Sequence, residues 1–195
     1  MRRLAGTVST ELEELLDEAA EIAERDVAVP LAYMPPRGVF RSAPSAQQLR
    51  ERIRKEMRWY ETAGAIEFCP AGMNPALFAH VVNGVLIVTR YPDDGKGRMC
   101  LSFSASGVTK AIVARSFRQP KVTQFLRAAR RGDWFLRMDI TKAFYNMKLT
   151  PEGRRFTAFV CPFTGRLGRF TVPVFGLRHA PEALYVVAGA AKGIF

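Results

Sequence analysis

Cysteine is scarce in this chain of 195 residues, and its spacing excludes two kinds of site. The three cysteines, Cys69, Cys100 and Cys161, are an odd number, lie far apart and have no pair of histidines nearby. Disulfide frameworks and zinc sites both need closely spaced or evenly paired ligands. We therefore expect three free thiols, most of them buried.

Long apolar runs are also absent. The longest, residues 81–88 and 183–191, are interrupted or fall short of the roughly 20 apolar residues that a membrane-spanning helix requires. Two arginines near the N-terminus are followed by an acidic stretch, and not by the apolar core of a secretory signal. We expect no membrane span, and an intracellular protein of the cytoplasm or nucleus.

Acidic residues are few beyond the first thirty positions. Residues 1–30 hold 3 basic and 8 acidic side chains, whereas residues 31–195 hold 26 basic and 10 acidic ones, a net charge of +16. Lys and Arg that face phosphates gain affinity by releasing condensed counterions. The main body of the chain is therefore expected to meet a polyanion. With 48% apolar residues, the chain is long enough for one domain or somewhat more.

The spacing of apolar residues predicts helices and strands in a mixed order, which indicates an α+β fold. A proline-rich stretch, residues 30–44, is expected to be an extended linker and a soft domain boundary. The predicted helices are residues 9–25, 45–63, 120–131 and 181–191. The predicted strands are residues 77–89 and 98–103, joined as a hairpin at an Asp-Gly turn, residues 135–140, and residues 156–161 and 169–174 as a second hairpin.

The helix predicted for residues 45–63 has an unusually basic surface. We expect Ser45 to cap its start and Gly64 to end it. Its basic side chains form either a solvated face or a phosphate-facing one; they are Arg50, Arg52, Arg54, Lys55 and Arg58.

One aspartate, Asp139, stands near the end of the buried strand predicted for residues 135–140. Its apolar neighbours make a buried charge costly unless a cation or hydrogen-bond donors meet it. We therefore expect Asp139 at a strand end that opens on a cleft. The residues alone allow a second interpretation, in which Asp139 caps a helix over residues 141–146.

Residues 134–145 (WFLRMDITKAFY) and residues 174–181 (VFGLRHAP) together resemble the palm of a reverse transcriptase. Two further segments match the family in order. Residues 94–103 (DGKGRMCLSF) are similar to the fingers hairpin of gypsy-type and related retroelement polymerases, and residues 156–159 (FTAF) match the strand after the first aspartate motif. The resemblance covers about residues 61–190. It implies an RNA-directed DNA polymerase.

The resemblance implies a partial right-hand polymerase, with fingers and the first half of the palm, built as an antiparallel sheet with packed helices. We expect residues 1–44 to form an N-terminal acidic helix and linker, residues 45–132 a fingers-like region, and residues 133–195 a partial palm. The family's later Tyr-X-Asp-Asp motif is expected downstream of Phe195. A single carboxylate holds two ions poorly, so we expect little or no polymerase activity from these 195 residues alone.

The resemblance also implies a catalytic role for Asp139, with Asp139 and Ile140 as ligands of Mg²⁺, or of Mn²⁺ as an alternative. Magnesium suits few carboxylates plus substrate phosphates, and two ions would assist an in-line displacement. Phe144, five positions after the aspartate, would lie under the sugar of the incoming nucleotide. Its ring would collide with a ribose 2′-hydroxyl, which implies deoxynucleoside triphosphates as substrates and a DNA product.

The nucleotide-binding residues implied by the resemblance are Arg98, Phe144, Phe175 and Gly176. The guanidinium of Arg98 would bind triphosphate oxygens in a bidentate way. Phe175 offers a flat face for stacking, and Gly176 lets the backbone approach a ligand.

The fingers hairpin departs from the family at its tip. Pro92 and Asp93 stand where the family usually has lysines, so Arg90 or Lys96 could supply the missing charge. The implied partners are an RNA or DNA template-primer and deoxynucleoside triphosphates.

Two alternatives remain open at this point. The first is a noncatalytic nucleic-acid-binding remnant of a polymerase that keeps a basic groove. The second rests on residues 91–94 (YPDD), which spell a Tyr-X-Asp-Asp motif upstream of Asp139, an order found in a few viral RNA polymerases.

Overall fold

The computed structural model describes residues 21, 24–89, 97–115, 123, 126–127, 129–133 and 142–192, with side chains of the last helix as far as Val186. Several sequence predictions fall mainly or wholly outside these residues. They are the helix of residues 9–25, the hairpin tip with its YPDD motif, the basic helix of residues 120–131 and the strand of residues 135–140.

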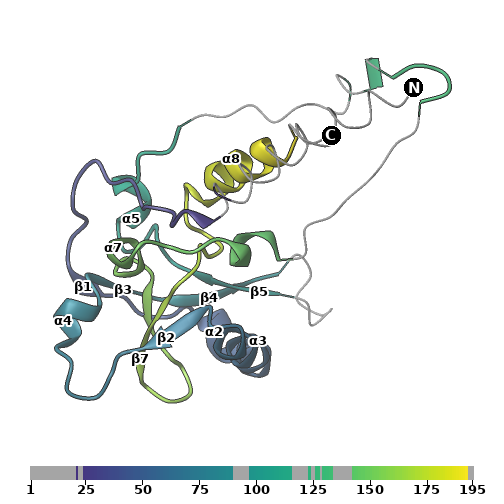
Figure 1. Ribbon diagram of the computed structural model, residues 1–195. Coiled ribbons are helices and arrows are strands. Elements are labelled where there is room, and N and C mark those ends of the chain that lie inside the picture. The colour runs from purple at the N-terminus through teal and green to yellow at the C-terminus, as the bar shows by residue number, and fades with distance from the viewer. Residues whose placement is uncertain are drawn as a thin grey trace.

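A five-stranded sheet forms the centre of the protein (Figure 1). Its order is β1 (Gly38–Val39), β3 (Val81–Asn83), β6 (Ala158–Val160), β7 (Leu167–Phe170) and β2 (Ile66–Phe68). The hairpin of β6 and β7 is confirmed, and it pairs Phe159 with Gly168. The α+β class is confirmed as well. The sheet is mixed and not wholly antiparallel, because β3 runs parallel to both β1 and β6.

A second, two-stranded sheet confirms the hairpin predicted between residues 77–89 and 98–103. Strands β4 (Val85–Val88) and β5 (Arg98–Leu101) are antiparallel, with Val88 opposite Arg98. Gly84 separates β3 from β4 and has no room for a side chain, since a Cβ atom there would collide with the carbonyl of Arg41. The chain thus passes from one sheet to the other at a position that only glycine fits.

Two helices take the place of the single helix predicted for residues 45–63. They are α2 (Pro44–Gln48) and α3 (Arg50–Thr62), which meet at Leu49. Ser45 does not cap α2. Its hydroxyl oxygen instead accepts a hydrogen bond from the Ile87 amide at 3.3 Å, which ties α2 to β4. Gly64, with φ of 65°, follows the end of α3 as predicted.

The remaining helical elements are short except the last. They are α4 (Pro75–Phe78), α5 (Val108–Ala111), the 3₁₀ helix η2 (Ala143–Asn146), α7 (Pro151–Arg154) and α8 (Ala180–Lys192). The last of these confirms the helix predicted for residues 181–191. In Figure 1, α2 and α3 lie on one side of the strands and α8 on the other. None of the helices among the described residues is long and apolar enough to span a membrane.

The first part of the predicted strand over residues 77–89 is helical instead. Asn74 explains the difference, because its side chain accepts a hydrogen bond from the Ala76 amide at 2.9 Å and so caps α4. Pro75 stands at the first helical position, where its missing N–H costs nothing.

The proline-rich stretch of residues 30–44 is extended, and it pairs with the body of the protein. Leu31 bridges to Ile112, and the Phe40 amide donates to the Val82 carbonyl at 2.8 Å. Strand β1 lies within this stretch. The division of the chain into three regions stays a prediction.

The core lies between α3 and the central sheet. Ile53, Met57 and Tyr60 of α3 are buried, and the Tyr60 ring meets the ring of Phe170 edge-on at 5.2 Å. The cysteines are free thiols, as predicted. Cys100 and Cys161 are buried, and Cys69 is half-buried.

His179, just before α8, is a buried titratable group without a partner. It is 3% exposed, and neither ring nitrogen makes a hydrogen bond among the described residues. Burial lowers its pKa to about 4, and Glu182 opposes this only weakly.

This depressed pKa predicts an acid-sensitive contribution to stability. The unfolded chain binds a proton at His179 near its ordinary pKa of about 6.5, while the folded chain does not until about pH 4, so stability falls as pH falls through this window. We expect the free energy of unfolding to drop by about 2 kcal/mol from pH 7 to pH 5 through this group. His179→Leu, compared with the native chain by urea unfolding at both pH values, should lose that share of the pH dependence. An equal drop in both proteins would contradict the prediction.

Candidate nucleotide site

Four residues predicted to bind a nucleotide come together in the structure. The Arg98 guanidinium, from β5, lies 4.8 Å from the centre of the Phe175 ring. The Phe144 ring, from η2, meets Phe175 edge-on at 5.4 Å. Gly176 follows Phe175 in the segment before α8. Segments separated by more than 70 positions in the sequence therefore form one surface, with Arg98 exposed and both rings half-buried.

Gly176 fixes the approach of the Phe175 segment to β5. Its φ is 98°, and a Cβ atom there would lie 2.9 Å from the carbonyl oxygen of Leu101. Both the backbone angle and the close contact require glycine. The sequence suggested close approach to a ligand, and the structure shows close approach to the protein's own strand.

Asp139 and Ile140, the predicted catalytic and metal-binding residues, lie outside the described residues. The structure does bear on the helix that Asp139 was alternatively expected to cap. That helix, η2, begins at Ala143, and its N-cap position is occupied by Lys142 with φ of 55°. Asp139 lies three positions before this N-cap residue, so capping of η2 does not explain the aspartate.

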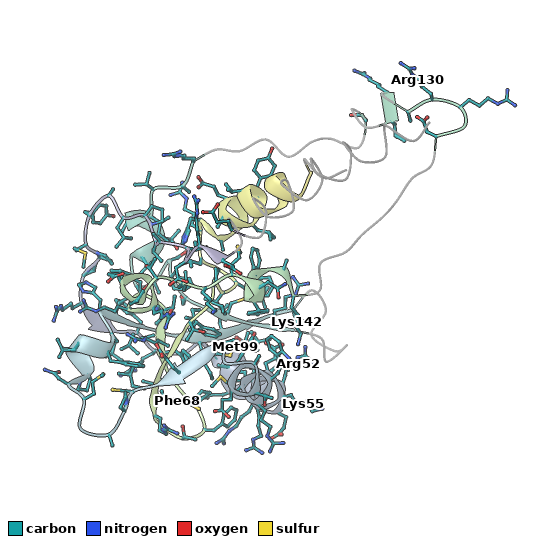
Figure 2. All side chains as sticks on the ribbon, viewed as in Figure 1. Arg52, Lys55, Phe68, Met99, Arg130 and Lys142 are labelled. Carbon is teal, nitrogen blue, oxygen red and sulfur yellow. The ribbon has the colours of Figure 1, made fainter. Side chains whose placement is uncertain are left out.

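A pocket of about 370 Å³ lies beside Phe175, between α3, β5 and η2; we call it the α3–η2 pocket. In Figure 2, Arg52, Lys55 and Lys142 are labelled along this side of the molecule. Its lining combines aromatic side chains with cations. The lining residues are Arg52, Lys55, Glu56, Trp59, Tyr60, Arg98, Lys142, Tyr145 and Phe175.

The Glu56 carboxylate joins α3 to β5 at the base of this pocket. One oxygen, Oε1, accepts from Arg52 Nε at 3.1 Å, and the same Nε also donates to the Gly97 carbonyl at 3.1 Å. The other, Oε2, accepts from the Met99 amide at 2.8 Å and from the Tyr60 hydroxyl at 3.2 Å. Both carboxylate oxygens are thus occupied by protein donors.

Two tyrosines extend this network toward η2. The Tyr60 and Tyr145 hydroxyl oxygens lie 3.0 Å apart. Tyr60 gives its proton to Glu56, so Tyr145 donates to Tyr60. Burial is the main cause that raises the pKa of both phenols, and for Tyr60 the neighbouring Tyr145 and Glu56 add to it. Both hydroxyls stay neutral near pH 7 and serve as hydrogen-bonding groups.

The Cys100 thiol next to this network is unreactive. Burial, with a smaller contribution from Glu56, raises its pKa to about 11. The thiolate that attacks electrophiles or binds metals is therefore scarce at neutral pH.

The described residues do not form a metal site on their own. No group of three or more His, Cys, Asp and Glu among them is arranged to hold an ion. Among the described residues, Glu56 is the one carboxylate that lines the α3–η2 pocket, and three donors already occupy it. The assignment of metal ligands to Asp139 and Ile140 stays a prediction.

Sequence reasoning missed several residues of this site. Lys142 stands three positions after Asp139, and Tyr145 is next to Phe144. Their closeness in sequence to predicted site residues was the signal that could have identified them. Trp59 and Glu56 lie on α3, for which the sequence analysis considered only the basic side chains. The structure separates those basic positions: Arg52 and Lys55 line the pocket, whereas Arg50 and Arg54 each lie 5.1 Å from the ring of Phe163.

Comparison with known proteins finds relatives among plant viruses. The chain is 34% identical over 88 residues to the enzymatic polyprotein of cauliflower mosaic virus (strain D/H), which is 45% of this chain and 12% of the polyprotein. It is 28% identical over 86 residues to the enzymatic polyprotein of Cestrum yellow leaf curling virus, which is 44% of this chain and 13% of the polyprotein. The matches thus span about an eighth of these relatives. No protein-family profile matches the chain.

Among solved structures, the fold is similar to prototype foamy virus protease-reverse transcriptase. The selenomethionine-labelled mutant matches with a TM-score of 0.60 and 20% identity, over 86% of this chain and 21% of that one. A foamy viral protease-reverse transcriptase in complex with double-stranded DNA matches with a TM-score of 0.57 and 17% identity, over 95% of this chain and 38% of that one.

The chain thus has the fold of a reverse transcriptase, and the resemblance to a retroelement reverse transcriptase domain is confirmed by both comparisons. Its gypsy-like character stays a prediction.

The Glu56 network predicts the effect of removing its charge. Glu56→Gln keeps the shape of the side chain but brings an amide against Arg52 and weakens the bond to Met99, so we expect a loss of about 2 kcal/mol in the free energy of unfolding. Glu51→Gln is the matched control on the same helix, since Glu51 makes one exposed pair with Arg54 at 3.1 Å and should cost less than about 0.5 kcal/mol. Urea unfolding of both variants measures the difference, and equal losses would refute a special role for Glu56.

Proposed function

We propose that this chain contributes the fingers and the first part of the palm to an RNA-directed DNA polymerase of a retrotransposon-like element. The observation that carries the proposal is the convergence of Arg98, Phe144 and Phe175, three residues that the resemblance assigns to nucleotide binding. Chance matches in sequence have no reason to meet on one surface.

In this arrangement, each of these residues has a different role in nucleotide binding. Arg98, exposed at the start of β5, binds triphosphate oxygens through its planar guanidinium. Phe144 lies against the sugar and excludes a ribose 2′-hydroxyl. Phe175 supports both, because its ring contacts Arg98 on one side and Phe144 at its edge. Asp139, with Ile140, would hold the Mg²⁺ or Mn²⁺ that stabilises the departing pyrophosphate.

The partners follow from the same proposal. Foamy viral protease-reverse transcriptase has been solved with double-stranded DNA. We propose a template-primer duplex and deoxynucleoside triphosphates for this protein, in the cytoplasm or nucleus. Because a single carboxylate holds two ions poorly, we expect the 195 residues alone to show little or no primer extension.

The aspartate gives a test that separates an enzyme from a noncatalytic binder, the second candidate favoured by the basic body of the chain. In the full-length protein, Asp139→Ala should abolish primer extension with Mg²⁺, because the proposed metal ligand is gone. Nucleic-acid affinity should stay unchanged or rise slightly, since one negative charge is lost. The two readouts are primer extension and fluorescence anisotropy with a labelled template-primer. Extension at the native rate by the variant would eliminate the proposed catalytic role.

The phenylalanine gives a test of sugar selection. In the full-length protein, Phe144→Val should raise the use of ribonucleoside triphosphates relative to deoxynucleoside triphosphates by about tenfold or more, because the smaller side chain leaves room for a 2′-hydroxyl. The measurement is the ratio of kcat/KM for the two substrates. Phe163→Leu, a half-buried aromatic on the loop between β6 and β7, is the control and should keep the native ratio. An unchanged ratio in Phe144→Val would rule out this role.

A further inference from the structure

Helix α3 has basic side chains on two different sides. A helix turns by about 100° per residue, so Arg50 and Arg52, two positions apart, point to opposite sides of α3. Arg52 lines the α3–η2 pocket. Arg50 and Arg54, four positions apart, share the other side. Their guanidinium groups each lie 5.1 Å from the centre of the Phe163 ring. A basic and aromatic surface therefore lies apart from the nucleotide site.

The Phe163 ring belongs to the turn between β6 and β7, which backbone hydrogen bonds hold closed. The Cys161 amide donates to the Arg166 carbonyl at 2.9 Å, and the Gly165 amide donates to the Cys161 carbonyl at 2.9 Å. The guanidinium of Arg166 lies 4.3 Å from the centre of the ring of Phe68, which ends β2 and is labelled in Figure 2. We use the name Phe163 surface for Arg50, Arg54, Phe68, Phe163 and Arg166.

The arginines of the Phe163 surface keep most of their positive charge. Among the described residues, the only carboxylate within ion-pair distance of them is that of Glu51, 3.1 Å from Arg54. The Glu51 side chain is 73% exposed, so water screens this pair and a phosphate can displace it. Three arginines against one carboxylate leave a net charge of +2. Aromatic rings attract these cations without neutralising them.

A hollow of about 430 Å³ adjoins the Phe163 surface at Arg50. Gln47 lines it and is exposed, and its side-chain amide can both donate and accept hydrogen bonds, as the edges of nucleobases do. Pro162 lines it as well and precedes Phe163 in the same turn. The hollow and the aromatic ring are therefore neighbouring parts of one surface.

These features fit the chemistry of a single strand of nucleic acid. Unstacked bases lie on aromatic rings and on the planes of guanidinium groups, and arginine also binds phosphate oxygens. The bases of a duplex are stacked on one another and do not reach such groups. An acidic peptide would pair with the arginines but would leave the ring faces without a partner. A single strand uses both the charge and the aromatic rings.

We propose that the Phe163 surface binds single-stranded nucleic acid, RNA or DNA, at a site separate from the nucleotide surface. The bases lie against the Phe163–arginine stack and the neighbouring hollow, and the phosphates lie against Arg50 and Arg166. The inference goes beyond the proposed function, because a noncatalytic nucleic-acid binder could use the same surface.

Fluorescence anisotropy with a labelled oligothymidylate of about 12 nucleotides tests the proposal on the 195-residue chain. We expect Phe163→Leu to lower the affinity about tenfold and to leave the salt dependence unchanged, because a stacking face is lost and no charge is removed. Arg50→Gln should lower the affinity about fivefold and reduce the slope of log K against log salt by about 0.7, because one phosphate contact is lost. Circular dichroism establishes that the variants are folded.

Two matched controls lie outside the Phe163 surface. Lys148→Gln removes an exposed charge between η2 and α7, and Tyr33→Leu removes an aromatic ring that is 53% exposed. Both should keep the affinity within about twofold of native, since salt screens a charge that touches no phosphate and an isolated ring stacks on no base. Equal losses in the controls and in the test variants would mean general attraction to a basic protein and would overturn the proposal.

Photochemical crosslinking locates the bound strand. An oligothymidylate that carries 5-iodouracil, irradiated with the native chain, should attach to the peptide that contains Phe163, because iodouracil reacts with an aromatic ring on which it stacks. Mass spectrometry identifies the peptide. Crosslinks confined to the peptides of Phe144 and Phe175 would place the strand at the nucleotide surface and overturn the proposal.

Competition identifies the kind of ligand. The ratio of the affinities for oligouridylate and oligothymidylate identifies RNA or DNA as the favoured strand, and either preference supports the proposal. A blunt DNA duplex of the same length that competes equally well overturns it. So does an acidic peptide of the same charge, which would make the surface a site for acidic proteins.

These titrations contain no primer, nucleotide or metal ion, so their outcome is independent of polymerase activity. Binding at the Phe163 surface by a protein that does not extend primers would leave this inference standing and remove the proposed function. An active polymerase whose Phe163→Leu and Arg50→Gln variants bind the single strand normally would do the reverse.

Discussion

The candidate site depends on one carboxylate, that of Glu56, which joins the helix of Arg52 and Lys55 to the strand of Arg98. It receives donors from its own helix, at Arg52 and Tyr60, and from β5, at the Met99 amide. Because β5 also supplies Arg98, this contact sets the distance between the basic side of α3 and the surface formed by Arg98 and Phe175. A buried carboxylate is costly unless its oxygens are hydrogen-bonded, so the geometry around it is tightly constrained. The hydrogen bond between Tyr60 and Tyr145 ties η2 to the same network.

Local chemistry made much of the fold predictable. The β4–β5 and β6–β7 hairpins and helix α8 follow from apolar runs, turn residues and a proline at a helix start, all of which act within a few residues. The parallel pairing of β3 with β1 and β6 was not predicted, because it joins segments more than 40 positions apart and leaves no local pattern. The break at Leu49 was missed for a similar reason: the contact of Ser45 with Ile87 is tertiary.

The residues of the candidate site also divide into those that the sequence predicted and those that only the structure revealed. Arg98, Phe144 and Phe175 were found through family motifs, and the structure shows why those motifs belong together. Trp59 lies outside the quoted motifs, and Lys142, although it lies within residues 134–145, was assigned no role; their contact spans 83 positions. The five basic residues of α3 could not be sorted from sequence, because the choice between solvent and pocket depends on which face of the helix β5 covers. The burial of Ile53, Met57 and Tyr60, together with the contact of Glu56 with β5, decides that face.

Lys142 shows how backbone strain and electrostatics combine at such a site. A left-handed conformation costs a residue with a side chain about 1–2 kcal/mol, and glycine would adopt it freely. The ammonium group over Trp59 returns a comparable amount, about 0.5–2 kcal/mol, and so offsets the cost of this conformation. A glycine at this position would ease the turn and lose the charge. The lysine instead turns the chain three residues after Asp139 and leaves a positive charge at the α3–η2 pocket.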